Sequence, residues 1–162
     1  MNVFKYFIIL FYFSGLTFGC RHKNELPPIS LLLLDSLTHI TIDPNEESSA
    51  TILLYFSPDC EHCQEETEGI LKNIKDFKTI QFYFIANESI DRMRIFNSVY
   101  NISKYQNIVL AQDYTFSFTK YFKSAVPPYL LIYNRRKELR AILAGKSTAK
   151  EIVQYIDKIK SL

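Results

Sequence analysis

The sequence has no tryptophan, only three cysteines and no long run of lysine or arginine. Its formal net charge is +2, and the composition therefore predicts neither nucleic-acid binding nor a polybasic membrane patch. No apolar run approaches the roughly 20 residues that a membrane-spanning helix needs. A tetrahedral zinc site takes about four ligands, and the chain offers no second cysteine pair to complete one.

What is present suits a single domain. A chain of 162 residues with 48% hydrophobic residues can bury one core, but hardly two of ordinary size. The triplet Gly145-Lys146-Ser147 resembles the end of a phosphate-binding loop, but Arg140 occupies the position of that motif's first glycine. We therefore expect one globular domain without a nucleotide site.

The N-terminus has the features of an export signal. A lysine precedes a short apolar run, and small residues follow before Cys20. Residues 16–20 resemble a bacterial lipobox, in which the signal is cleaved before a cysteine that then carries lipid. Thr17 and Phe18 depart from the usual pattern. The sequence predicts a lipoprotein signal peptide at 1–19 and a lipid anchor on Cys20, with an ordinary cleaved signal or an uncleaved anchor as alternatives.

The segment 20–30 is polar and contains adjacent prolines, which favours a lipid-anchored tether before a domain at 31–162. Apolar and β-branched runs alternate with helical periodicity along that domain. The predicted elements are strands at 31–34, 38–42 and 51–56, a helix after 63, a strand at 79–86, a helix at 90–100, a strand at 108–111, a helix at 116–122, strands at 129–133 and 138–143, and a closing helix after 148. This order predicts an α/β fold with a mixed sheet and helices on both faces.

The dithiol Cys60-Glu61-His62-Cys63 follows the buried strand and opens the first long helix. A helix N-terminus presents unpaired N–H groups and partial positive charge, which favours a thiolate. Cys60 is the more exposed sulfur and the expected nucleophile, and Cys63 is spaced to attack a mixed disulfide. Half of a metal site or an inert pair are the alternatives.

Charged neighbours surround the dithiol. His62 can stabilise a thiolate, whereas negative charge from nearby acids opposes one. Those acids are Asp59, Glu61, Glu65 and Glu66. Asp59 has a second interpretation as the helix N-cap, and His62 can equally be a solvated loop residue. The direction of the redox reaction therefore stays open at this level.

Two motifs together carry a family resemblance. Phe56-Ser57-Pro58-Asp59 leads into the dithiol, and Ala125-Val126-Pro127-Pro128-Tyr129 precedes a later strand. The pair resembles the TlpA-like branch of the thioredoxin superfamily over 31–162. The resemblance implies a thioredoxin-like fold, a central mixed β-sheet flanked by helices, with an N-terminal β extension. It also implies a TlpA-type βα insertion, which 88–111 matches.

The same resemblance assigns further site residues. A cis-proline faces the dithiol in that family, and Pro127 is the residue we match to it, although adjacent Pro128 makes the match ambiguous. Val126 would then offer backbone groups to an extended substrate. Reductive members often carry a glutamate three residues after the second cysteine, and Glu66 matches it, which suggests proton transfer with Cys63. A solvated helix acid is the alternative for Glu66.

These observations predict a membrane-anchored, periplasm-facing lipoprotein that exchanges disulfides with exported proteins. We expect reduction rather than oxidation, protein thiols and disulfides as substrates, an unidentified redox partner protein, no metal and no cofactor. A thiol peroxidase is the alternative enzyme, although Ser57 and Leu53 stand where its threonine and proline are usual. A metal-binding or chaperone lipoprotein that keeps the fold without turnover is the third hypothesis.

Overall fold

The computed structural model describes residues 24–43, 48–123 and 125–160. Its centre is one sheet of seven strands in the order β2-β1-β5-β4-β3-β6-β7. β3 and β4 run parallel, as do β4 and β5, and the other neighbours are antiparallel. The strands are β1 (Ser30–Leu33), β2 (His39–Thr41), β3 (Ala50–Tyr55), β4 (Ile80–Ala86), β5 (Ile108–Gln112), β6 (Tyr129–Asn134) and β7 (Leu139–Ala144).

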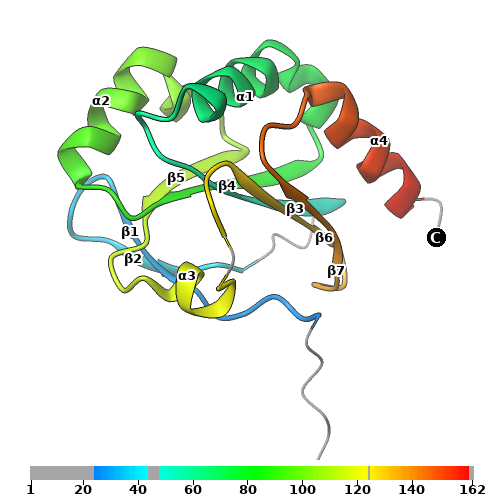
Figure 1. The fold of residues 1–162 in the computed structure, drawn as a ribbon, viewed down its shortest axis with the longest axis horizontal. Coiled ribbons are helices and arrows are strands. Elements are labelled where there is room, and N and C mark those ends of the chain that lie inside the picture. The colour runs from blue at the N-terminus through cyan, green and yellow to red at the C-terminus, as the bar shows by residue number, and fades with distance from the viewer. Residues whose placement is uncertain (1–23, 44–47, 124, 161–162) are drawn as a thin grey trace, which may run out of the picture.

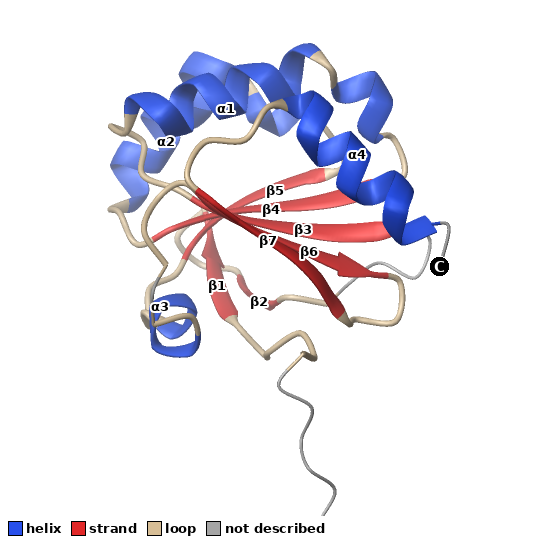
Figure 2. Ribbon diagram, turned by 45° about the vertical axis from the view of Figure 1, so that its right-hand side comes forward, coloured by secondary structure: helices blue, strands red, loops and turns tan. Residues whose placement is uncertain are grey.

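Helices cover both faces of the sheet unequally. Figures 1 and 2 show α1, α2 and α4 on one face and α3 on the other, while the β1–β2 hairpin forms one edge of the sheet. The helices are α1 (Glu61–Lys72), α2 (Ile90–Tyr100), α3 (Ser117–Tyr121) and α4 (Ala149–Lys160), with 3₁₀ turns η1 (Ile74–Phe77) and η2 (Ile102–Lys104). The predicted α/β class and mixed sheet are confirmed.

Local sequence explains where these helices begin. The Ser89 hydroxyl accepts a hydrogen bond from the Arg92 backbone N–H at 3.4 Å, and α2 follows. Thr148 and Glu151 cap each other across the first turn of α4, since each side chain accepts the other's backbone N–H. Buried Asp113 accepts the backbone N–H groups of Ser117 and Phe118, both at 2.8 Å, where α3 begins.

The core explains why β3 is central. All six of its residues are buried, and it pairs with β4 on one side and β6 on the other. A strand covered on both faces reads as a continuous apolar run, as residues 50–55 do. One cluster of apolar side chains fills the space under α1, α2 and α4, and a second lies between the sheet and α3. β3 therefore ends at a rigidly held point, from which the dithiol loop begins.

The predicted additions are present. The β1–β2 hairpin extends the sheet through antiparallel pairing of β1 with β5. α2, η2 and β5 lie between β4 and α3, where 88–111 predicts an insertion. β5 pairs parallel to β4, so the inserted unit widens the sheet and places α2 beside α1 (Figure 1).

The N-terminal segment differs from its prediction as a tether. Ile29 is fully buried and Pro27 is buried, although both belong to the predicted tether. The Leu26 N–H donates to Lys137 O at 3.0 Å, and the N–H of Leu139, the first residue of β7, donates to Asn24 O at 2.7 Å. The folded unit thus includes residues from Asn24 onward, because apolar side chains of this segment complete the second core cluster.

The predicted signal peptide at 1–19 and lipidated Cys20 lie outside the described residues. Within the described ranges, no helix has both the length and the apolar character to cross a membrane.

Candidate active site

Cys60 and Cys63 lie where β3 passes into α1. Hydrogen bonds hold the loop between β3 and α1 in place. The Phe56 N–H donates to Ile85 O at 2.9 Å, and the Cys60 N–H donates to Ser57 O at 3.1 Å. The Gln64 side-chain amide reaches back to Pro58 O at 2.7 Å. These bonds fix the first cysteine at the end of the strand that is buried on both faces.

Cys60 is the N-cap residue of α1. Its backbone is extended, with φ −81° and ψ 114°, and no side chain caps the helix. The first N–H groups of a helix carry partial positive charge, so an uncapped N-terminus favours an anion on the nearest side chain. The Cys60 sulfur is that side chain, and it is partly exposed. Asp59 is therefore not the N-cap.

Cys63 differs sharply from Cys60 in its surroundings. It is fully buried on the core side of α1. Burial, reinforced by a hydrogen bond with Cys60, raises the pKa of the Cys63 thiol to about 12. Cys63 therefore keeps its proton, whereas the Cys60 sulfur is partly exposed to solvent.

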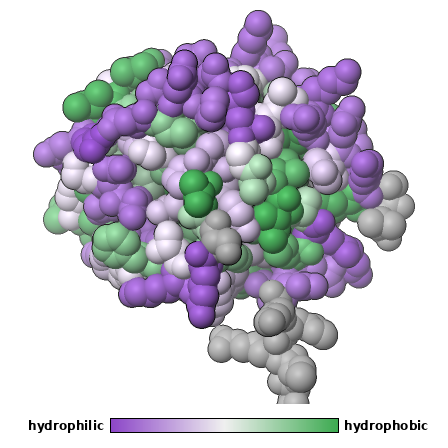
Figure 3. All heavy atoms as spheres, in the orientation of Figure 1, coloured by the Kyte–Doolittle hydropathy of each residue, from purple (hydrophilic) through white to green (hydrophobic). Residues whose placement is uncertain are grey.

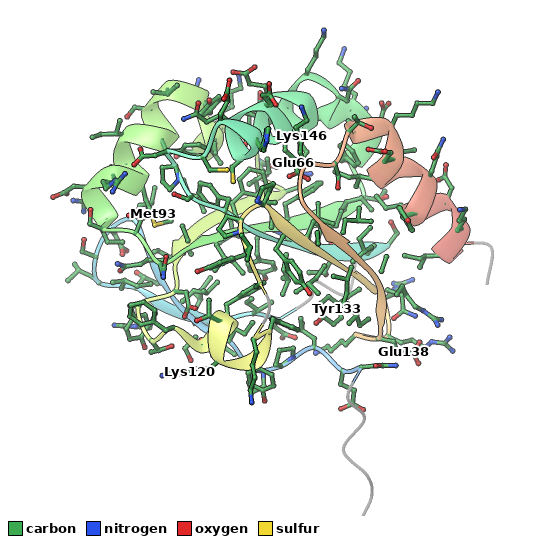
Figure 4. The ribbon with its side chains drawn as sticks, in the orientation of Figure 1. Glu66, Met93, Lys120, Tyr133, Glu138 and Lys146 are labelled. Carbon is green, nitrogen blue, oxygen red and sulfur yellow. The ribbon has the colours of Figure 1, made fainter. Side chains whose placement is uncertain are left out.

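Glu66 lies one turn beyond Cys63, on the same buried face of α1. It is 2% exposed, and burial raises the pKa of its carboxyl to about 8, with the charge of Glu151 adding to the increase. The Ser147 backbone N–H opposes this increase, but neither carboxyl oxygen makes a hydrogen bond of good geometry. Figure 4 shows Glu66 under α1, near Lys146 of the loop that leads into α4. A solvated helix acid is not what the structure contains here.

Two other acids near the dithiol, Glu65 and Asp59, have cationic partners. Glu65 accepts from Lys146 Nζ at 2.6 Å and lies 3.5 Å from His62 Nδ1. These contacts lower the pKa of Glu65, with the Lys146 hydrogen bond as the main cause. The side chain of His62 is exposed and directed to Glu65. Asp59 forms an ion pair with Arg92 of α2.

The cis-proline is Pro128, not Pro127. The cis peptide bond joins Pro127 to Pro128, so the sequence match is wrong by one position. The Val126–Pro127 and Pro127–Pro128 peptide bonds both precede a proline, and both tolerate cis geometry. Local sequence therefore does not choose between them. Pro128 is buried and precedes Tyr129, which pairs with Tyr55 at the end of β3. The proline loop and the dithiol thus share one end of the sheet.

The residue before the cis-proline is consequently Pro127. It is half-buried and has no N–H, so its backbone can only accept a hydrogen bond. Val126 is 71% exposed and is the adjacent loop residue with both backbone groups.

An apolar groove of about 290 Å³ lies beside the dithiol loop. Its far wall is α2, where Ile95 and Val99 are 65% and 69% exposed. In Figure 3, hydrophobic surface is visible at the upper left, where Figure 1 places α2. The lining residues are Pro58, Asp59, Gln64, Arg92, Ile95, Phe96, Val99 and Tyr100.

Comparison with known proteins gives structural matches only. No family model matches the chain, and no curated protein sequence is significantly similar to it. DsbF from MTB has a TM-score of 0.66 at 14% identity, covering 85% of this chain and 96% of that one. A secreted Mycobacterium tuberculosis disulfide oxidoreductase, described as homologous to E. coli DsbE, has a TM-score of 0.63 at 15% identity. The match covers 80% of this chain and 94% of that one. A peroxiredoxin-like protein from Aquifex aeolicus has a TM-score of 0.68 at 12% identity, covering 84% of this chain and 85% of that one.

This chain has the thioredoxin fold. The fold predicted from the dithiol and proline motifs is thereby confirmed, with the two cysteines at the start of its first long helix.

Within this thioredoxin fold, two cationic residues near the dithiol were not predicted from the sequence. Arg92 and Lys146 bring positive charge to Asp59 and Glu65. The spacing of Glu88, just before α2, and Arg92, in the first turn of α2, was a usable signal, since opposite charges four residues apart can pair. Nothing near residue 146 in the sequence pointed to residue 65.

Proposed function

We propose that this protein is an extracytoplasmic thiol–disulfide oxidoreductase of the TlpA-like kind. The observation that carries the proposal is the contrast between Cys60, partly exposed at an uncapped helix N-terminus, and Cys63, buried with a pKa raised to about 12. The Cys60 sulfur is accessible to a substrate, and the Cys63 sulfur is available to attack the resulting mixed disulfide. Two similar structures are described as DsbF and as a disulfide oxidoreductase.

The reaction has two exchange steps. The Cys60 thiolate attacks one sulfur of a substrate disulfide, forms a mixed disulfide and releases the other substrate sulfur as a thiolate, which takes up a proton. The Cys63 thiol then gives its proton to the Glu66 carboxylate and attacks Cys60. A Cys60–Cys63 disulfide forms as the bond between Cys60 and the substrate breaks, and the second substrate sulfur leaves as a thiolate that takes up the proton from Glu66. Two electrons pass from the pair to the substrate, and a redox partner protein restores them.

Reduction is the favoured direction. Net negative charge near a dithiol disfavours its thiolate and so favours its disulfide form, which makes the pair a better reductant. Glu61 is exposed beside Cys60 and supplies negative charge in the first turn of α1. His62 opposes this effect only in part, since it is directed to Glu65.

Substrate contact is proposed for the proline loop. Val126 is exposed and supplies both a backbone N–H and a carbonyl, and Pro127 supplies a carbonyl. An extended substrate segment beside these groups would lie at the end of the sheet where Cys60 emerges.

We further propose that lipid on Cys20 holds the protein in a periplasm-facing position. The support is the lipobox-like stretch at 16–20 and the description of one similar structure as secreted. Several acyl chains on one cysteine give stable anchoring, because each buried methylene contributes about 0.8 kcal/mol.

The decisive experiment traps the substrate. Cys63→Ser, expressed in the protein's own host, should accumulate mixed disulfides on Cys60 that a reductant releases. Cys60→Ser is the matched control and should trap nothing. If Cys63→Ser also traps nothing, and the purified wild-type protein fails to reduce a generic protein disulfide such as that of insulin, the proposal is wrong.

A thiol peroxidase is the second candidate, because a peroxiredoxin-like protein shares the fold. In this chain, however, the Ser57 hydroxyl is directed to Glu88 Oε1 at 3.4 Å, instead of supporting Cys60. Consumption of hydrogen peroxide that depends on Cys60, without reduction of protein disulfides, would favour this candidate. Stoichiometric Zn²⁺ or Cu⁺ binding lost in either cysteine variant would favour the metal-binding alternative.

A further inference from the structure

We propose that Arg92 of the inserted helix is a positioning residue that sets the thiolate content of Cys60 by neutralising the carboxylates of Asp59 and Glu88. The proposal rests on the dithiol function proposed above. Its chemistry nevertheless concerns the Cys60 sulfur alone, and it can be tested without any protein substrate.

The position of Arg92 follows from the start of α2. Ser89 caps the helix, so Arg92 lies in the first turn. From there its guanidinium reaches Glu88 Oε2 at 3.2 Å and also forms an ion pair with Asp59. Asp59 is the residue directly before Cys60. One cation of the inserted helix therefore joins the dithiol loop to the segment that follows β4.

Further bonds hold this arrangement together. The Ser57 hydroxyl donates to Glu88 Oε1 at 3.4 Å, and the Gln112 side-chain amide donates to Glu88 O at 2.9 Å. Glu88 is thereby fixed between the dithiol loop and β5. A planar guanidinium can satisfy two carboxylates in a fixed geometry, which an ammonium does less well.

Arg92 matters because the other cationic side chains described near the dithiol already have an acidic partner. Lys146 and His62 pair with Glu65. Burial raises the pKa of Glu66 to about 8, so this carboxyl is largely uncharged at neutral pH. The described part of the proline loop, 125–128, carries no charged side chain. The charged or titratable groups around the dithiol are Asp59, Glu61, His62, Cys63, Glu65, Glu66, Glu88, Arg92 and Lys146.

Loss of Arg92 would leave the carboxylates of Asp59, which directly precedes Cys60 in the chain, and Glu88 without this cationic partner. Negative charge disfavours a nearby thiolate. The nucleophilic form of Cys60 would then appear only at higher pH, and the dithiol would be oxidised more readily to its disulfide. The wild-type arrangement thus keeps Cys60 reactive in an acidic neighbourhood.

Arg94 provides a matched control on the same helix. Its side chain is 48% exposed, against 45% for Arg92, and it also has an acidic partner, Asp91 at 3.0 Å. Its other bonds go to Leu34 O and the Ser36 hydroxyl, in the N-terminal hairpin. Arg94→Gln therefore removes the same charge and a similar ion pair without touching the dithiol loop.

The experiment measures the iodoacetamide alkylation rate of Cys60 between pH 5 and 9 in the full chain carrying Cys63→Ser, with the Cys60 peptide followed by mass spectrometry. Arg92→Gln should move the midpoint of the rate profile to higher pH and slow alkylation below it about three- to tenfold. Arg94→Gln should leave the profile unchanged. Arg92→Lys, which keeps the charge but not the planar guanidinium, should give a rate between those of wild type and Arg92→Gln.

A second substitution identifies the route. Asp59→Asn added to Arg92→Gln should return the midpoint toward wild type, and Asp59→Asn alone should lower it. With both cysteines present, Arg92→Gln should shift the equilibrium with glutathione toward the disulfide about three- to tenfold, where tenfold corresponds to about 30 mV.

An unchanged Arg92→Gln profile, an equal shift in Arg94→Gln, or no rescue by Asp59→Asn would overturn the proposal. If Arg92→Gln fails to fold, Asp59→Asn alone is the test. A rate-profile midpoint at higher pH in that variant than in wild type would overturn the proposal. Failure of substrate trapping with a shifted alkylation profile would instead count against the proposed function and leave the role of Arg92 standing.

Discussion

Cys63 and Glu66 lie one helical turn apart on the buried face of α1, and both are held in their protonated forms by burial. The charge of Glu66, when present, raises the pKa of Cys63 further. In the reaction proposed above, Glu66 is the proton acceptor for Cys63. With a pKa of about 8, that acceptor titrates close to neutral pH.

Glu66→Gln should change the pH dependence of the resolving step. In the wild type, Cys63 attack on a mixed disulfide should accelerate with pH up to about 8, as the Glu66 carboxylate forms. The variant should lose this inflection and react about 100-fold more slowly at pH 8, in the usual range for a lost general base. Stopped-flow measurement of single-turnover release between pH 5.5 and 9.5 checks this. Glu65→Gln, its exposed neighbour, is the control and should keep the inflection.

Glu66 should also make the protein less stable as pH rises. Its folded-state pKa of about 8 exceeds the unfolded value of 4.5, so the folded state binds more protons between these values. The free energy of unfolding should fall through this window by up to about 1.4 kcal/mol per pH unit. In Glu66→Gln this contribution should disappear. Urea denaturation of both proteins from pH 4 to 9 tests it, and parallel curves would contradict the assignment.

Ile29→Ala should destabilise the domain strongly, although the sequence places this residue in a tether. Ile29 is fully buried in the cluster between the sheet and α3. Removing a buried isoleucine side chain to alanine costs about 2–5 kcal/mol. Leu37→Ala, at a position 81% exposed, should change stability by less than about 0.5 kcal/mol. Equal denaturation midpoints for the two variants would show that residues 24–30 do not belong to the core.

Asp113→Ala should loosen α3 and the loop that follows it. The buried Asp113 carboxylate accepts from the Ser117 and Phe118 N–H groups and from the Ser117 hydroxyl at 3.0 Å. Its removal leaves buried donors unpaired and should cost about 2–3 kcal/mol. Hydrogen exchange should show faster exchange at these two amides, with little change in α4. Asp113→Asn retains one acceptor oxygen and should be less damaging.

The sequence determined most of the fold because strand and helix signals are local. A continuous apolar run predicted β3 to within one residue, and the helix predicted at 90–100 has the observed bounds of α2. The dithiol was equally predictable, since its position between a buried strand and a helix is a local feature of the sequence. The packing of residues 24–30 was not readable, because it depends on apolar contacts with distant segments.

Tertiary structure alone decided how the site is charged. The sequence showed four acids near the dithiol and offered no basis for their net effect. Folding brings Arg92 to Asp59, brings Lys146 to Glu65 across 81 residues, and buries Glu66 so that it keeps its proton. It also placed the cis bond before Pro128, one residue beyond the predicted position. Electrostatic partners and burial are properties of three-dimensional proximity, and no short window of sequence contains them.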